Sequence, residues 1–141
     1  MTYHGVFSTL NKYSTDELFF PYYDFGGTLW ENRENYEKWD PARHLNNWAT
    51  PHLIIHSELD YRLPISVGLE SFNILQTRGV PSKFVTFSDE NHVSINGGLS
   101  FSKYVPALTR LQWVLKPENA LVWYNEVLGW INKYSGIQCS K

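Results

Sequence analysis

The chain has 141 residues, of which 43% are hydrophobic and 18% are charged, and its formal net charge is −2 with the histidines neutral. That length corresponds to one domain, and that composition is typical of a globular protein rather than a disordered one. The small negative charge, without a basic cluster, argues against nucleic acid or an anionic membrane as a partner. No apolar run approaches the ~20 residues that would span a bilayer, and the first residues lack the basic and apolar regions of a signal peptide.

The N-terminal third of the chain, residues 1–49, is irregular and rich in aromatic side chains. Ser14 to Glu17 predicts the start of a short helix, because a hydroxyl cap precedes acids in the first turn, and Pro21 is expected to end it. Residues 24–27 predict a turn, residues 31–38 a second short helix, and Asp40-Pro41 the cap and first position of a third. We interpret the following aromatic side chains as core or interface, with a substrate pocket as the alternative: Phe19, Phe20, Tyr22, Tyr23, Phe25 and Trp30.

The clearest element is a predicted strand over residues 52–56. Leu53 to Ile55 form a short, continuous apolar run of branched side chains, which is typical of a strand buried on both faces of a parallel sheet. The polar loop that follows presents Asp60, and a helix over roughly residues 64–78 is expected to begin at Pro64. Its apolar residues recur at helical spacing and are expected to face the core: Ile65, Leu69, Phe72 and Leu75. Open α/β sheets keep their chemistry at the carboxyl ends of such strands.

The same order of elements then repeats. Residues 82–87 alternate as a strand does, and the polar loop that follows leads to His92. Pro117 predicts the start of a last helix. Its expected sheet-facing stripe is Leu121, Tyr124, Val127, Leu128 and Ile131. Strand, helix, strand, helix predicts an α/β fold with two parallel strands and a right-handed crossover. A sheet of only two strands would leave an unpaired apolar edge at residues 52–56, which predicts poor solubility.

Asp60 and His92 are the candidate catalytic residues. The stretch between them is long enough for one helix and one strand, so they are expected at neighbouring loop tips. In a triad the carboxylate fixes the histidine tautomer, and the histidine takes the proton of a serine. Taken singly, each residue is more often an ordinary loop side chain. The strained Gly-x-Ser-x-Gly turn that exposes such a serine is absent from the sequence, and neither Ser57 nor Ser88 has that setting.

For the other polar residues the sequence predicts no catalytic or metal-binding role. His52 and His56 stand four positions apart, a spacing that suits a helix rather than a strand, so no metal site is predicted. Arg62 is expected to pair with a nearby carboxylate rather than to contact substrate. Cys139, the lone cysteine, has no nearby base and no predicted role. No cofactor is predicted.

Five segments carry a more specific signal. They are Trp30–Glu34 (WENRE), Trp39–Arg43 (WDPAR), Ile55–Pro64 (IHSELDYRLP), Arg78–Lys83 (RGVPSK) and Asp89–His92 (DENH). Together they resemble the C-terminal end of members of the prolyl oligopeptidase family of serine peptidases, and within it the secreted fungal enzymes of the dipeptidyl-peptidase V type. The resemblance extends from about Gly5 to about Tyr134.

This resemblance implies that residues 1–141 are part of the α/β-hydrolase catalytic domain of such an enzyme, with Asp60 and His92 as its triad aspartate and histidine. Intact members hydrolyse peptide substrates and release N-terminal dipeptides through an acyl-enzyme. Their β-propeller and nucleophilic serine would lie upstream of Met1, so the chain alone is expected to be inactive and to need that missing N-terminal part. The alternatives are a non-catalytic remnant that acts as a binding module, or an esterase.

One stretch departs from the family pattern. In such relatives the DENH motif runs directly into WVLKPEN, whereas here the segment 93–112 separates the two motifs. The hypothesis is a translated intron, because Val93-Ser94-Ile95 can be encoded as a splice donor and Gln112 as an acceptor. Such an insertion is expected to remove the second anchor of the His92 loop.

Overall fold

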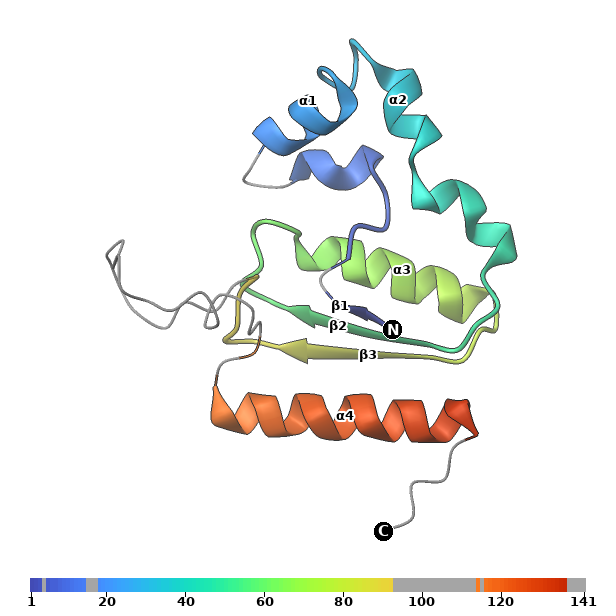
Figure 1. Ribbon diagram of the computed structural model, residues 1–141, viewed down its shortest axis with the longest axis vertical. Coiled ribbons are helices and arrows are strands. Elements are labelled where there is room, and N and C mark those ends of the chain that lie inside the picture. Colours follow the sequence, from blue (N-terminus) through green and yellow to red (C-terminus); the bar gives the residue numbers. More distant parts are fainter. Residues whose placement is uncertain (4, 15–17, 93–113, 115, 137–141) are drawn as a thin grey trace.

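The computed structural model describes residues 1–3, 5–14, 18–92, 114 and 116–136. Its centre is a three-stranded parallel sheet in the order β1-β2-β3, with helix α3 on one face and helix α4 on the other (Figure 1). These elements are β1 (Thr2–Tyr3), β2 (His52–Ser57), α3 (Ile65–Thr77), β3 (Ser82–Phe87) and α4 (Pro117–Ser135). The predicted α/β fold and the parallel pairing of the two main strands are confirmed.

Strand β2 is the middle strand of the sheet. It pairs with β3 along its whole length, from His52 opposite Ser82 to Ser57 opposite Phe87. On its other side, Ile54 and Ile55 pair with the two residues of β1. The prediction of a two-stranded sheet with a fully unpaired edge at residues 52–56 is therefore wrong, because a strand as short as β1 carries no alternation that a sequence pattern could reveal.

The side chains of β2 alternate between two apolar clusters. On the α4 side the cluster contains Leu53, Ile55, Phe87 and Val127. On the α3 side it contains Ile54, Leu75 and Val80. As predicted, Phe84 packs on the α3 side and Val85 on the α4 side. Each fully buried aliphatic side chain contributes about 1.5–3 kcal/mol to folding, so β2 is a principal source of stability.

The stripe predicted for α4 is largely wrong. Of its five members only Val127 is buried, while Leu121 and Leu128 are 66% and 56% exposed. The sheet is instead covered by Trp123, Val127 and Trp130, which share a second apolar stripe of the same helix. In α3, similarly, Leu69 was expected to face the core and is 41% exposed.

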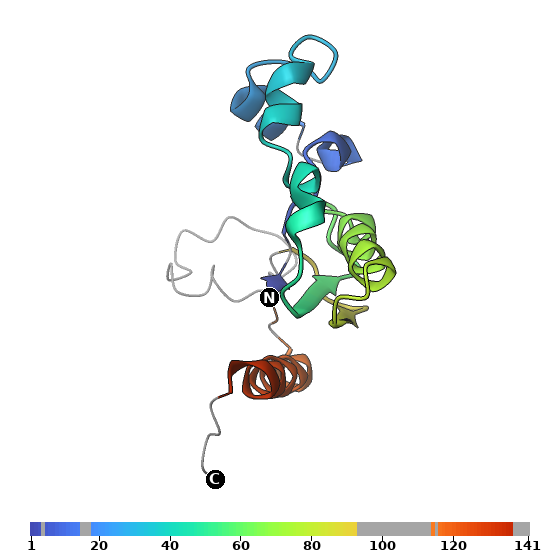
Figure 2. The ribbon, with the colours of Figure 1, turned by 90° about the vertical axis from the view of Figure 1, so that its right-hand side faces the viewer.

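Residues 10–47 form a separate group of short helices that extends away from the sheet (Figure 2). They are η1 (Leu10–Ser14), α1 (Phe19–Phe25), α2 (Arg33–Lys38) and the 3₁₀ helix η2 (Pro41–Asn47). Pro21 does not end a helix as predicted; it lies in the first turn of α1, where the missing N–H has no intrahelical partner to lose. Gly26 ends α1 with φ 74°, the left-handed conformation that favours glycine.

Two buried side chains hold this group together. Tyr36 has no exposed surface, and its hydroxyl donates to the carbonyl of Gly27 at 2.8 Å. Asp40 accepts hydrogen bonds from the backbone N–H groups of Ala42 at 3.1 Å and Thr9 at 3.2 Å. The predicted Asp40 cap is therefore confirmed, and the same carboxylate also ties the start of the group to its end.

The aromatic side chains singled out in this region divide into two kinds. Phe25 is buried, whereas Tyr23 is 88% and Trp30 is 73% exposed, so most of the set is surface rather than core. Thr15 to Glu17, Cys139 and the segment 93–112 lie outside the described residues. Among the helices that are described, none combines the length and the apolar character needed to cross a membrane.

Candidate active site

Asp60 lies in the turn that follows β2, and its side chain has no solvent exposure. The turn binds its own carboxylate, because the backbone N–H of Leu63 donates to Asp60 Oδ1 at 2.8 Å. The backbone N–H of Asp60 in turn donates to the carbonyl of Ser57 at 3.2 Å. A buried carboxylate is costly unless it is hydrogen-bonded, so these contacts fix its position.

His92 reaches the other oxygen of this carboxylate. Its Nδ1 lies 2.8 Å from Asp60 Oδ2, and its side chain is 14% exposed. An ionised carboxylate only accepts hydrogen bonds, so Nδ1 carries the proton in this pair. In a neutral imidazole the other nitrogen, Nε2, is then the basic one.

The two loops are joined by hydrogen bonds beyond the ends of their strands. The N–H of Glu58 donates to the carbonyl of Phe87 at 2.9 Å, and the N–H of Leu59 donates to the carbonyl of Glu90 at 3.1 Å. These contacts continue the pairing of β2 with β3 into the loops. They explain why two side chains that are far apart in the sequence meet at one edge of the sheet.

His56 is a part of this site that the sequence pattern did not assign. It is 1% exposed, its Nε2–H donates to the carbonyl of Leu63 at 2.5 Å, and Nε2 lies 3.7 Å from Asp60 Oδ2. A Cβ at Gly68 would lie only 2.9 Å from His56 Nδ1, so α3 approaches this imidazole closely. His56 therefore shapes the turn that presents Asp60; the signal available in the sequence was its place in a strand buried on both faces.

The His92 loop is also tied to the first turn of α4. Asp89 accepts from Lys116 Nζ and, at 2.8 Å, from Asn119 Nδ2. The buried carboxylate of Glu90 accepts from the backbone N–H of Lys116 at 3.0 Å. The expectation that the insertion removes the second anchor of this loop is therefore wrong, since residues on both sides of the insertion remain in contact.

The surface ion pair between Asp89 and Lys116 shifts the pKa of both side chains. Hydrogen bonds from Lys116 and then Asn119 lower the pKa of the Asp89 carboxyl below its ordinary value. The bond to Asp89 raises the pKa of the Lys116 ammonium above its own. The pair is thus charged over a wide range of pH.

The two serines near the site do not have the position of a nucleophile. Ser57 is fully buried within β2, and Ser88 is an exposed turn residue. Across the residues that the structure describes, no three His, Cys, Asp or Glu side chains converge as metal ligands would. Arg62 lies at the surface, and its pairing with a carboxylate stays a prediction.

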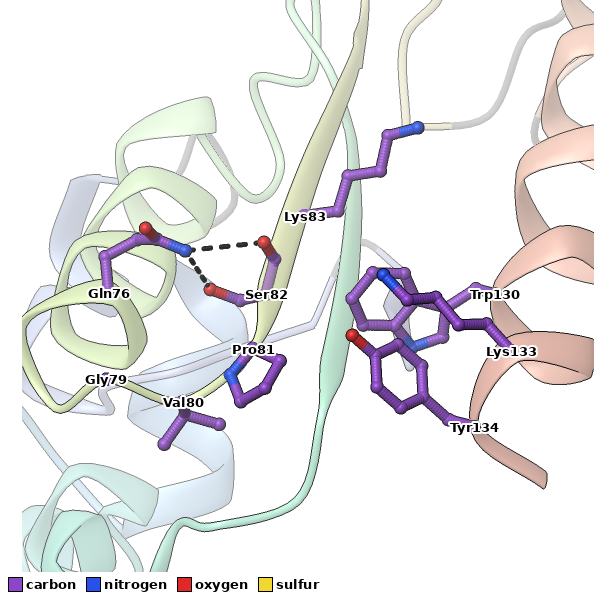
Figure 3. A pocket seen from close by; sticks show the side chains of 9 residues that line it. All are labelled: Gln76, Gly79, Val80, Pro81, Ser82, Lys83, Trp130, Lys133 and Tyr134. Carbon is purple, nitrogen blue, oxygen red and sulfur yellow. Dashed lines mark hydrogen bonds between the residues drawn. The ribbon is translucent and has the colours of Figure 1, made fainter. Parts of the chain in front are cut away.

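A cavity lies elsewhere in the molecule, between the start of β3 and the end of α4 (Figure 3). It has a volume of about 490 Å³, and it is lined by Ser82, Lys83, Trp130 and Lys133 among others. Ser82 is the first residue of β3, whereas the Asp60–His92 pair lies beyond its last residue, Phe87. This cavity is therefore at the opposite end of the sheet from the candidate site.

Comparison with known proteins identifies the family. The model of the prolyl oligopeptidase family matches residues 1–138. Dipeptidyl-peptidase 5 of Aspergillus oryzae is 49% identical over 140 residues, which are 98% of this chain and 17% of that protein. Dipeptidyl-peptidase 5 of Schizosaccharomyces pombe is 48% identical over 132 residues, 93% of this chain and 16% of that protein. The chain thus spans about one sixth of the length of these relatives.

Solved structures agree on the fold. The acylaminoacyl peptidase of Pyrococcus horikoshii superposes with a TM-score of 0.71 at 20% sequence identity. The match covers 99% of this chain and 20% of the other. Together with the family match, this likeness shows that the architecture described here is part of an α/β-hydrolase fold.

Proposed function

Since the chain belongs to the prolyl oligopeptidase family, we propose that Asp60 and His92 are the carboxylate and the base of a serine-peptidase triad. The observation that carries this proposal is the 2.8 Å contact between His92 Nδ1 and the buried carboxylate of Asp60. Asp60 would hold the imidazole in the Nδ1–H tautomer and stabilise the imidazolium. His92 Nε2 would take the proton of the attacking serine and later give it to the leaving amine.

The complete enzyme, in this proposal, hydrolyses peptide substrates and releases dipeptides from the N-terminus through an acyl-enzyme. Support comes from the sequence identity of 46–49% to relatives named dipeptidyl-peptidase 5. The serine and the oxyanion-hole donors are supplied by a part of the enzyme that this sequence does not include, so this chain alone is inactive. Secretion, which the family resemblance implies, belongs to the same proposal.

We also propose that residues 1–141 are one partial catalytic domain and that residues 93–112 are a translated intron within it. The family pattern on both sides of this segment supports the proposal. Sequencing of the transcript tests it: a spliced message should join the codon of His92 directly to that of Trp113. A message that retains the segment as its main form would refute it.

The activity is tested with the polypeptide encoded by the transcript that contains these codons together with the upstream reading frame. We expect hydrolysis of dipeptidyl arylamides and labelling by a fluorophosphonate serine probe. The change Asp60→Asn should lower kcat by about 10⁴-fold, because the wrong histidine tautomer is then favoured. Asp24→Asn, which alters an exposed carboxylate paired with Lys12 in the α1 region, is the matched control and should leave kcat unchanged.

Two results would contradict the proposal. Arylamide hydrolysis that survives Asp60→Asn would remove Asp60 from the triad. Ester hydrolysis without any peptide hydrolysis would favour the esterase alternative, and the absence of both activities and of probe labelling would favour a non-catalytic module.

A further inference from the structure

Glu90 is a buried carboxylate that stands two positions before His92 in the sequence. It is 1% exposed, and its Oε1 lies 3.0 Å from both the backbone nitrogen of Lys116 and Nδ2 of Asn119. Both donors belong to the start of α4, whose own N-cap residue, Lys116, makes no side-chain cap bond. Glu90 therefore caps this helix from a different loop, and the favourable field of the helix N-terminus adds to the two hydrogen bonds.

The backbone of Glu90 makes a second connection. Its carbonyl accepts the N–H of Leu59, the residue directly before Asp60, at 3.1 Å. One residue thus contacts the Asp60 loop through its main chain and α4 through its side chain. Glu90 precedes His92 and the insertion, whereas Lys116 and Asn119 follow the insertion, so the side chain of Glu90 joins the two sides of the inserted segment.

We propose that Glu90 is a positioning residue for His92: by fixing the His92 loop to the first turn of α4, it keeps the imidazole against Asp60 despite the insertion that follows. This inference rests on the proposed role of the Asp60–His92 pair. Glu90 itself does not touch the reacting atoms; it acts through the loop that carries the histidine. Rigid support of this kind is what holds a catalytic group within a fraction of an ångström of its productive position.

Asp89 provides the matched comparison. It contacts the same two residues of α4, Lys116 and Asn119, but as an exposed surface pair. Exposed ion pairs contribute little to stability because solvent screens them. Removing a buried acceptor costs much more, because its former donors are then left buried without a hydrogen-bond partner. Removing the Asp89 carboxylate should therefore disturb the loop far less than removing that of Glu90.

The test uses the full chain and nuclear magnetic resonance with two readouts. The first is the tautomer of His92 and the solvent exchange of its Nδ1–H, assigned with His92→Asn. The second is exchange of the backbone amides of Lys116 and Ala120 at the start of α4. In Glu90→Ala we expect both Nδ1–H and these amides to exchange about tenfold faster or more, since a buried charge-assisted bond is lost. Amides of β2 and β3 should keep their protection.

Two variants sharpen the result. Glu90→Gln retains an oxygen acceptor without the charge, so its exchange rates should lie between those of the wild type and Glu90→Ala. Asp89→Asn should stay within about twofold of the wild type. If Glu90→Ala does not fold, Glu90→Gln decides the question with the same two readouts.

The outcomes separate this inference from the proposed function. Faster exchange in α4 together with an unchanged His92 Nδ1–H would overturn the positioning role and leave Glu90 as a helix cap alone. An unchanged first turn of α4 would overturn the cap as well. If the wild type lacks the Nδ1–H tautomer at His92, the proposed triad fails, while exchange at Lys116 and Ala120 still reports whether Glu90 holds the helix.

Discussion

The sheet region and the N-terminal helical region are stabilised in different ways. In the sheet, β2 buries Leu53, Ile54 and Ile55 between two helices, each with at most 1% exposure. In residues 10–47, the apolar Pro21 and Phe25 are buried beside two side chains that make specific hydrogen bonds, Tyr36 and Asp40. The sheet region thus depends mainly on apolar burial, which tolerates little loss of volume, whereas the helical region depends in addition on individual polar contacts.

The difference also bears on the site. Asp60 and His92 follow the two strands that pair along their whole length, so the sheet region carries the candidate chemistry. The helical region presents large exposed rings, including Tyr23 and Trp30.

The largest expected effect is in the sheet. Ile55→Ala removes a fully buried side chain that contacts Phe87 and Val127, so it should lower the free energy of unfolding by about 2–5 kcal/mol. Urea denaturation followed by circular dichroism measures this loss. Leu128→Ala, on the exposed side of α4, is the control and should cost no more than about 0.5 kcal/mol. Equal losses of unfolding free energy in Ile55→Ala and Leu128→Ala would contradict the conclusion that the sheet region depends mainly on burial.

A smaller effect is expected in the helical region. Tyr36→Phe removes the hydroxyl that donates to Gly27, leaving that carbonyl without this donor, and should cost about 1 kcal/mol. Burial, and then the hydrogen bond with Tyr13, raise the pKa of Tyr36 well above its ordinary value. The hydroxyl therefore keeps its proton during a urea denaturation experiment at neutral pH, which measures this loss. Tyr23→Phe, at an 88% exposed position, should leave the unfolding midpoint unchanged. A loss in Tyr36→Phe as large as that in Ile55→Ala would show that polar contacts rival burial.

The smallest effect concerns His52 at the start of β2. Burial lowers the pKa of this imidazole below 6.5 in the folded chain. On acidification the unfolded chain therefore binds a proton first, and stability falls as the pH drops from about 6.5 toward the folded pKa. His52→Gln should reduce this loss in denaturation experiments between pH 7.5 and 5.5. The exposed His44 provides the control: His44→Gln should keep the wild-type slope, and an unchanged slope in His52→Gln would contradict the assignment.

The sequence predicted best those elements whose side chains follow one simple period. Strands 52–56 and 82–87 were found within one position of their ends, because branched residues and strict alternation mark buried strands. The approach of Asp60 to His92 followed from parallel strands alone. The contacts of His56 and Glu90 were not predicted, since each involves a turn or a helix that no local pattern encodes.

Helix α4 shows why periodicity was insufficient elsewhere. The helix carries two apolar stripes of helical spacing, one with Leu121 and Leu128 and the other with Trp123 and Trp130. Period alone cannot tell which stripe faces the sheet. The tryptophan stripe is the one that packs there, on the cluster of Leu53, Ile55 and Phe87.

The pairing of β1 with β2 has a consequence for the order of folding. The segment between Thr2 and its partner Ile54 contains the whole N-terminal helical region, whereas the shorter segment between Ile54 and Phe84 contains only α3 and its loops. Closing the longer loop costs more entropy and is rewarded by only the two pairs that β1 makes. We therefore expect β2, α3 and β3 to assemble first and the N-terminal strand to dock last and detach most readily. Pulse-labelling of amides during refolding would reveal this order.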